Sequence, residues 1–266
     1  MKTVTIFIDG SDNDRESLAT ALAFCRCLDS HLRVVNPRLP DNVATSPDGH
    51  ALVVVRDEQE VAARRAVARA AFDEVCGTQP LADWRESDET EVQSIVSHGL
   101  YSEAVVLERV SEEQGPQVLA LNTALFETPG PVLVTPPKAP ATVGQSVAVV
   151  WSPTVQSARA VRSALPILHK ADSVTLLTNS AKEADPGPLA EYLAGHGIAT
   201  GARRFDGAAL TARGRGRAIL AAADACGADL LVMGAYGENR LAALIGLGRA
   251  TRKIVSATKI PALLQH

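Results

Sequence analysis

A chain of 266 residues, 46% of them hydrophobic, can bury a core large enough for two domains of ordinary size. Its net charge of −4 and pI near 5.9 give no basic excess of the kind that binds nucleic acid or an anionic membrane surface, so neither is expected as a partner. The first residues lack the apolar core of a secretory signal, and no apolar stretch reaches the roughly 18 residues that span a bilayer, so we expect a cytoplasmic protein.

The chain repeats itself. Residues 4–11 (VTIFIDGS) and 147–154 (VAVVWSPT) both read as an apolar strand that ends in a small polar turn. An Ala-rich amphipathic helix is predicted after each of them, over 16–27 and 155–168. Each half then offers a second strand, a fourth strand and a short apolar strand opened by proline, at 32–36, 103–107 and 131–134 in the first half and at 173–178, 229–233 and 261–264 in the second.

Most of these strands are apolar on both faces and alternate with helices, which predicts an α/β fold of two tandem domains. Each domain should be an open five-stranded parallel sheet with helices on both faces. The segment 135–145 (TPPKAPATVGQ) has the prolines and small residues of a linker, and we place the domains at 1–142 and 143–266. The short final strands would be aggregation-prone edges if left bare, so the domains should pair through them as a pseudo-dimer. Whether two chains also form a homodimer stays open.

In sheets of this kind the ligand site lies outside the carboxyl ends of the strands, where the strand order reverses. In the second half, two groups of residues should meet there: Trp151, Ser152 and Pro153 with Gly234 and Gly237. In the first half, the corresponding groups are Asp9, Gly10 and Ser11 with Glu108 and Arg109.

The segment 228–251 (ADLLVMGAYGENRLAALIGLGRAT) reads as a buried strand that breaks at Gly234, turns through Gly237 and enters a helix that closes on Gly248. Glycine at a strand end lets a ligand approach the backbone, and a helix N-terminus offers free N–H groups and a partial positive charge to an anion. The pattern favours a nucleotide. The alternative is structural: Gly234 only turns the strand, Gly237 permits a positive φ, and Gly248 lets the helix pack close to the sheet.

Both halves resemble universal stress protein domains, arranged in tandem along the whole chain as in two-domain bacterial members. The resemblance is carried by 228–237, by GRATR at 248–252, by PALL at 261–264, by 157–168 and by 193–197 with its His-Gly pair. It implies a flavodoxin-like, adenine-nucleotide-α-hydrolase-like fold, a role in the stress response, and ATP or AMP at the glycine loop, with Mg²⁺ accompanying ATP. The residues expected around the nucleotide are Trp151, Ser152, Leu177, Met233, Gly234, Gly237, Gly248, Arg249, Ala250 and Thr251.

The second half departs from the pattern of the ATP-binding members. Their glycines are spaced G-x2-G-x9-G, whereas Leu247 stands at the third position here and one inserted residue is needed to reach Gly248. Arg249 follows, where a small hydroxyl would touch phosphate; the arginine either pairs with phosphate oxygens or fills the space they need. Those members also end their first strand with Asp, and this half has Ser152 there.

The first half keeps the acid but not the glycines. Asp9 ends its first strand, Glu108 is the counterpart of Gly234, and no Gly-rich turn follows Arg109. A carboxylate at a strand tip repels polyphosphate. Any site in this half would be formed by Asp9, Gly10 and Ser11, and we expect it to hold no nucleotide.

Other reactive residues receive structural interpretations. The cysteines, at positions 25, 27, 76 and 226, have no metal or disulfide spacing and are expected as reduced, mostly buried thiols. His98, His169 and His196 each lie alone near a predicted helix end, and no metal site is expected. The acids Asp12, Asp14 and Glu16 should cap the first helix.

The basic run at 213–217 (RGRGR) reads as an RNA-like patch, an anion clamp at a helix entrance or, as we favour, a solvated loop. No nucleophile elbow, zinc-binding helix or paired carboxylates are found, so the chain is not expected to be an enzyme, with slow ATP hydrolysis left open. Two functions remain. The first is binding of ATP or AMP in the second half, which orders the glycine loop and signals to a protein partner of unknown identity. The second is a scaffold in the stress response that binds no nucleotide and works by dimerising or docking.

Overall fold

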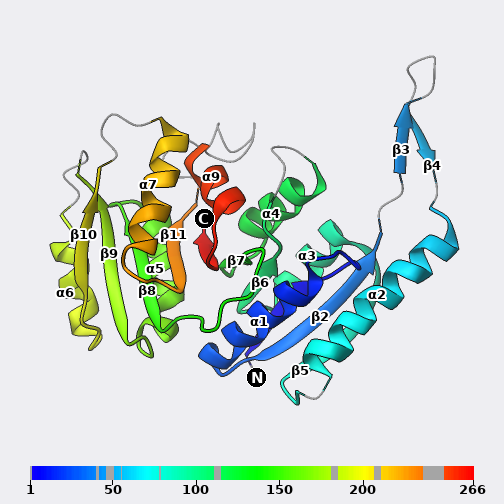
Figure 1. The fold of residues 1–266 in the computed structure, drawn as a ribbon, viewed down its shortest axis with the longest axis horizontal. Helices are drawn as coiled ribbons and strands as arrows, with labels where there is room; N and C mark the ends of the chain where they lie inside the picture. The colour runs from blue at the N-terminus through cyan, green and yellow to red at the C-terminus, as the bar shows by residue number, and fades with distance from the viewer. Residues whose placement is uncertain are drawn as a thin grey trace.

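The computed structural model describes residues 2–39, 42–45, 51–54, 56–77, 79–110, 115–180, 185–206, 211–235 and 249–266. Its main feature is a single ten-stranded sheet with the order β10-β9-β8-β11-β12-β7-β6-β1-β2-β5. Figure 1 shows the strands of the first half on the right and those of the second half on the left, with β7 and β12 between them.

Among the described residues, the first half contributes five strands to this sheet and packs four helices against it. The strands are β1 (Thr3–Phe7), β2 (His31–Arg38), β5 (Ala82–Thr90), β6 (Ala104–Leu107) and β7 (Val132–Val134). The helices are α1 (Asp14–Leu28), α2 (Glu58–Cys76), α3 (Glu91–Gly99) and α4 (Pro116–Glu127). The neighbouring strands that this half contributes to the main sheet are all parallel, as predicted.

The second half repeats the arrangement. Its strands are β8 (Ser146–Trp151), β9 (Ser173–Asn179), β10 (Gly201–Phe205), β11 (Leu230–Gly234) and β12 (Ala262–Gln265). Its helices are α5 (Val155–Leu168), α6 (Gly187–Gly195), α7 (Ala212–Asp224) and α9 (Arg249–Ala257). The strands are again mutually parallel, so the prediction of two five-stranded parallel sheets is confirmed.

The two halves join through their final strands. β12 pairs with β7 in the antiparallel direction, with Leu263 opposite Leu133 at the centre of the pair. Every residue of β7 and β12 is buried. The predicted pairing is therefore confirmed: each short apolar edge opened by a proline is covered by its counterpart.

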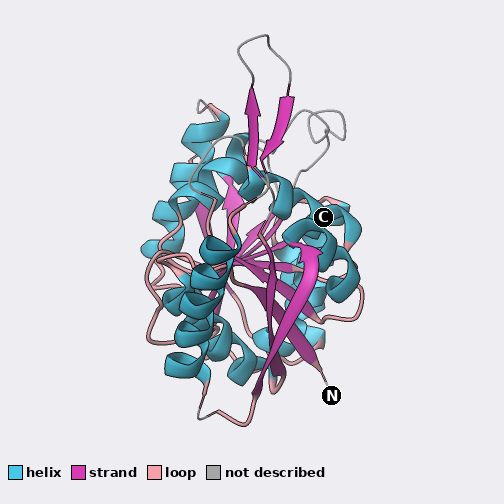
Figure 2. Ribbon diagram, turned by 90° about the vertical axis from the view of Figure 1, so that its right-hand side faces the viewer, coloured by secondary structure: helices cyan, strands magenta, loops and turns pink. Residues whose placement is uncertain are grey.

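The core has two layers that both run across the junction. Apolar side chains from α1, α2, α5 and α6 pack on one face of the sheet, and those from α3, α4, α7 and α9 pack on the other. Figure 2 shows the sheet edge-on between these helices. Strands with two covered faces need apolar residues at every position, which explains why the central strands read as continuous apolar runs.

The third strand of each half is implied by the five-stranded sheet but was not located in the sequence, and one hairpin was not predicted. β5 and β10 are the outer strands of the sheet, and they carry charged residues that are exposed or partly exposed. They therefore lack the apolar pattern by which the other strands are predicted. β3 (Asn42–Thr45) and β4 (Ala51–Val54) form a separate antiparallel ribbon between β2 and α2, which stands away from the main sheet in both ribbon views.

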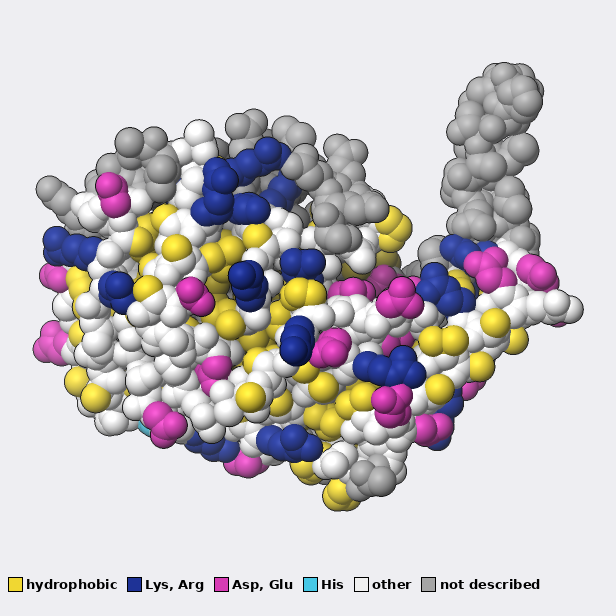
Figure 3. Space-filling view, in the orientation of Figure 1, with side chains coloured by type: hydrophobic (Ala, Val, Ile, Leu, Met, Phe, Trp, Pro, Cys, Tyr) yellow, Lys and Arg dark blue, Asp and Glu magenta, His cyan; other side chains and the backbone are white. Residues whose placement is uncertain are grey.

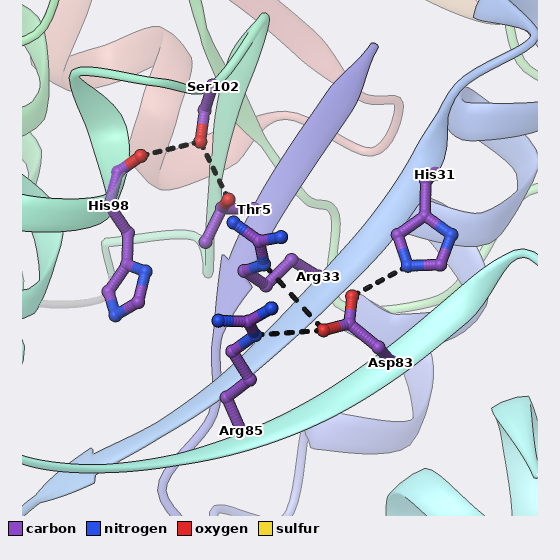
Figure 4. A network of polar contacts seen from close by, with 7 residues as sticks. All are labelled: Thr5, His31, Arg33, Asp83, Arg85, His98 and Ser102. Carbon is purple, nitrogen blue, oxygen red and sulfur yellow. Dashed lines mark hydrogen bonds and ion pairs between the residues drawn. The ribbon is translucent and has the colours of Figure 1, made fainter. Parts of the chain in front are cut away.

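The outer strand β5 is held by a polar network centred on Asp83 (Figure 4). The Asp83 carboxylate accepts from His31 at 2.6 Å and from Arg85 at 3.0 Å, with Arg33 at 3.7 Å. Burial acts to raise the pKa of Asp83, but the hydrogen bonds and the arginine charges outweigh it and leave this pKa below its ordinary value. The carboxylate therefore stays ionised and ties β5 to β2.

Two expectations for individual residues need correction. The basic run at 213–217 is not a solvated loop but the beginning of α7, where Thr211 accepts from the Gly214 N–H and Gly214 and Gly216 are buried. A Cβ on Gly216 would lie 2.9 Å from the Lys253 Cβ, so glycine allows α7 and α9 to approach. Among the cysteines, Cys25 and Cys76 are buried thiols as expected, but Cys27 and Cys226 are only half-buried.

The linker is anchored by one carboxylate. Asp229, just before β11, accepts hydrogen bonds from the backbone N–H groups of Gly144, Gln145 and Ser146 at 3.0, 3.1 and 3.0 Å, and from the Thr142 hydroxyl at 2.6 Å. These contacts fix the end of the linker where β8 begins. The predicted domain boundary at residue 142 falls in this anchored segment and stays a prediction.

We predict that Asp229→Ala lowers the free energy of unfolding by about 2–3 kcal/mol, because it leaves three N–H groups and a hydroxyl without their charged acceptor. Urea denaturation measures this change. The matched control is Asp172→Ala, which removes an exposed carboxylate nearby and should change the free energy of unfolding by less than about 0.5 kcal/mol. Equal effects of the two substitutions would show that Asp229 does not anchor the linker.

Candidate functional site

The strand order of the second half reverses between β8 and β11, and the predicted site residues meet there in part. Met233 in β11 pairs with Val150 in β8, so Trp151 and Gly234 end neighbouring strands at the same edge. Ser152 follows directly and begins the loop to α5. The helices α5, α7 and α9 all begin at this edge, because each precedes or follows a parallel strand of the same sheet.

The beginning of α5 carries three hydroxyl groups in contact. Thr154 caps the helix by accepting from the Ser157 N–H at 3.3 Å, and its hydroxyl donates to Ser157 Oγ at 3.1 Å. Ser152 Oγ lies 3.1 Å from Ser157 Oγ. Ser152, the residue that replaces the expected acid, is thus part of a neutral polar cluster at a helix N-terminus.

Gly234 is needed for packing. A Cβ at this position would lie 2.6 Å from the Ser157 backbone nitrogen and 2.7 Å from the Gln156 carbonyl carbon. The first turn of α5 therefore occupies the space beside its Cα, and any larger residue would push the helix away from β11. This close approach supplies a structural reason for the glycine that neither of the sequence interpretations named.

The two residues expected as apolar walls lie inside the core. Leu177 is completely buried and Met233 is 6% exposed, and both belong to the layer beneath α7 and α9. Trp151 is only partly buried and packs against the opposite layer. Of the three, Trp151 is the side chain best placed for contact with a ligand at the strand edge.

The glycine loop itself is described only at its two ends. Tyr236, Gly237 and Gly248 lie outside the described residues. Arg249 is the first residue of α9, Ala250 is partly buried, and Thr251 is 5% exposed. The structure thus places Ala250 and Thr251 in the first turn of the helix that begins at the candidate site.

Basic residues gather over α7 and α9. Figure 3 shows Lys and Arg side chains clustered on the surface formed by these two helices. The sequence places Arg213, Arg215 and Arg217 in the first turns of α7, and Arg252 and Lys253 in α9. Helix N-termini carry partial positive charge, so this end of the second half attracts anions.

The corresponding edge of the first half is acidic. A cavity of about 110 Å³ opens there between β1, β6, α3 and α4. Its lining includes the four carboxyl groups of Asp9, Asp14, Glu91 and Glu108 and the hydroxyl groups of Ser11 and Ser17. Ligand pockets usually measure about 300–1,000 Å³, so this cavity is also small for a nucleotide.

The carboxyl groups in this cavity disfavour one another's ionisation. Burial raises the pKa of Glu91 to about 7, and the charges of Asp9 and Glu108 add to the rise. Burial raises the pKa of Asp14 to about 6, against hydrogen bonds from the Ser11 hydroxyl and the Gly10 N–H. The pKa of Glu108 is also raised, first by burial and then by Asp9.

The three residues of the predicted first-half site do meet in this region. Asp9 and Ser11 line the cavity, while Gly10 turns away to contact α2, where its carbonyl accepts from Arg64 at 2.9 Å. Gly10 has a φ of 87°, which favours glycine. The expectation that Asp14 caps α1 is wrong in detail, because its carboxylate accepts from the loop residues Gly10 and Ser11 instead of from a helix N–H.

Sequence reasoning missed Glu91. It is the first residue of α3, after Thr90, where an acid reads as a favourable helix-start residue. Only the packing of α3 beside β1 and β6 brings it to the same cavity as Asp9 and Glu108.

We predict that Glu91→Gln raises the free energy of unfolding by about 2 kcal/mol at pH 8 and leaves it nearly unchanged at pH 4.5. The folded state holds the Glu91 proton up to about pH 7, whereas the unfolded chain releases it near its ordinary pKa of 4.5. Stability therefore falls as pH rises between these values, and the amide removes that loss. Denaturation at several pH values measures the slope.

The control for this prediction is Glu127→Gln, at the exposed end of α4. It should leave the pH dependence of stability unchanged. An unaltered slope in Glu91→Gln would contradict the account of the acidic cavity.

Comparison with solved structures identifies the fold. The chain is similar to a universal stress protein from Archaeoglobus fulgidus, with a TM-score of 0.71 and 16% identity over 99% of this chain and 95% of that one. It is also similar to a functionally unknown protein from Pseudomonas aeruginosa, with a TM-score of 0.60 and 14% identity over 100% of this chain and 92% of that one. The predicted resemblance to universal stress proteins is thus confirmed as a fold over the whole chain.

Sequence comparisons add no further assignment. No model of a protein family matches the chain, and no curated protein matches it in sequence. Within the described residues, no helix is long and apolar enough to cross a membrane, and no group of three or more His, Cys, Asp or Glu side chains is arranged to hold a metal ion.

Proposed function

We propose that this chain is a stress-response protein of the universal stress type that binds an adenine nucleotide, ATP or AMP, at the carboxyl edge of its second half. The observation that carries the proposal is the contrast between the two equivalent edges. One has a glycine-ended strand, hydroxyl groups and basic helices, and the other has four carboxyl groups in a small cavity.

Charge decides which half receives the phosphates. Between two unit charges about 4 Å apart near a protein surface, the interaction is on the order of several kcal/mol, so Glu108 and Asp9 would oppose a polyphosphate strongly. The N-termini of α5 and α9 and the arginines of α7 would favour it. The second half is therefore the nucleotide-binding half in this proposal.

The residues take distinct roles. The first turn of α9, with Ala250 and Thr251, is positioned to offer N–H groups to phosphate. Trp151, partly exposed at the end of β8, offers an aromatic face to the base. Mg²⁺ would accompany ATP through the phosphate oxygens and water. Binding would change the surface that a protein partner contacts.

A scaffold function is the second candidate, and one surface favours it. Large apolar side chains are exposed directly after α3 and on α4, with Leu100 50%, Tyr101 82% and Leu119 55% exposed. Large apolar side chains left exposed to solvent are found at contact surfaces between proteins. In this alternative, neither half binds nucleotide and the rigid ten-stranded sheet presents docking faces.

Equilibrium dialysis with labelled ATP and AMP tests the proposal. We expect one nucleotide per chain, and we expect Arg249→Ser to change the affinity for ATP by about tenfold. A fall in affinity would assign the arginine to phosphate pairing, and a rise would show that it occupies phosphate space. Either direction places the nucleotide at the start of α9.

The matched control is Arg204→Ser, which removes the same charge from the outer strand β10. It should leave the affinity within about twofold. No binding at millimolar ATP or AMP would exclude the nucleotide function and leave the scaffold, and equal effects of the two arginine variants would place the nucleotide elsewhere.

A further inference from the structure

Thr178 carries a buried hydroxyl group that lacks a partner. It lies near the carboxyl end of β9, it is 1% exposed, and its Oγ1 has no hydrogen-bond partner among the described residues. In the register of the sheet it pairs with Trp151, the last residue of β8. Buried hydroxyl groups are almost always hydrogen-bonded, so a group left without a partner needs an explanation.

The first half shows how the same position is satisfied when no ligand is required. Asn36 is the counterpart of Thr178, because Val4 pairs with Leu32 in β2 as Val147 pairs with Val174 in β9. Asn36 is also buried, at 3% exposure. Its amide nitrogen donates to the Ile8 carbonyl at 2.8 Å, and its amide oxygen accepts from Arg65 at 3.2 Å.

The difference between the halves therefore lies in the partner. Both halves place a buried polar group at the end of the second strand, beside the strand at which the order reverses. The first half supplies two partners from its own chain, and the described residues of the second half supply none. Within the described part of the chain, Thr178 therefore has a hydrogen-bonding position that no protein group fills.

We infer that Thr178 and Trp151 together recognise the base of the bound nucleotide, with the Thr178 hydroxyl bonded to the polar edge of the ring and the Trp151 indole packed on its face. This inference rests on the proposed function and names the residue that reads the base. A hydroxyl both donates and accepts, so it suits the mixed edge of a purine. An indole stacks on any planar heteroaromatic ring.

The position of these two residues separates them from the phosphate end of the site. Thr178 and Trp151 lie on β9 and β8, on the side of the sheet covered by α5 and α6. The basic helices α7 and α9 cover the other side. A nucleotide that crosses the strand edge can thus present its base to one side and its phosphates to the other. Because the Thr178 hydroxyl is sealed from solvent, binding requires a neighbouring group to move aside.

The test compares Thr178→Val, Thr178→Ser and the control Thr175→Val, which makes the same change three residues earlier in β9. Calorimetric titrations use ATP and, as a probe without a base, inorganic tripolyphosphate. We expect Thr178→Val to weaken ATP binding about tenfold and to leave tripolyphosphate binding unchanged, while Thr178→Ser and Thr175→Val bind ATP like the unaltered protein. Ligand-free Thr178→Val should also melt at a higher temperature, because it no longer buries a hydroxyl without a partner.

Each outcome decides the inference. If the unaltered protein binds ATP and Thr178→Val binds it equally well, the base-reading role is wrong and the proposed function stands. An equal loss of ATP and tripolyphosphate binding in Thr178→Val would also overturn that role, since the change would then act on the whole site. If the unaltered protein binds no ATP, the proposed function fails and the role of Thr178 fails with it.

Discussion

The antiparallel pairing of β7 with β12 is the constraint on which the rest of the structure depends. Each of these strands is short, apolar and opened by a proline, and neither could remain as an exposed edge without inviting aggregation. Their pairing converts two five-stranded sheets into one and lets both core layers continue across the junction. It also fixes the two strand edges at which ligands could bind relative to each other.

The two halves repeat one fold, but the equivalent edges of their sheets differ in charge. Equivalent positions carry Glu108 in the first half and Gly234 in the second, and their neighbours follow the same division. In the first half, burial and then the neighbouring acids raise the pKa of Glu91 and Glu108, and this acidic edge disfavours a bound anion. In the second half, hydroxyl groups and basic helices face the same kind of edge.

The sequence predicts the central strands and the helix α5. The central strands were found because both of their faces are apolar, and α5 has the predicted bounds because Thr154 caps it at its first residue. The outer strands β5 and β10 were not located, because a strand that is paired on one side only can carry charged residues and then lacks an apolar pattern. The basic run 213–217 reads as a loop although it begins α7, because Gly216 serves the packing of α7 on α9, a tertiary requirement that composition does not reveal. Glu91 and Thr178 were not predicted as site residues for a similar reason. Each is brought to its site by packing against a strand that is distant in the sequence.

Crystals grown with a non-hydrolysable ATP analogue test the central claim most directly, because both edges of the sheet are visible in one experiment. The account predicts density for one nucleotide per chain at the carboxyl ends of β8 and β11, with its base beside Trp151 and its phosphates at the start of α9. Density in the acidic cavity of the first half, or no nucleotide in a crystal grown at millimolar concentration, would contradict it.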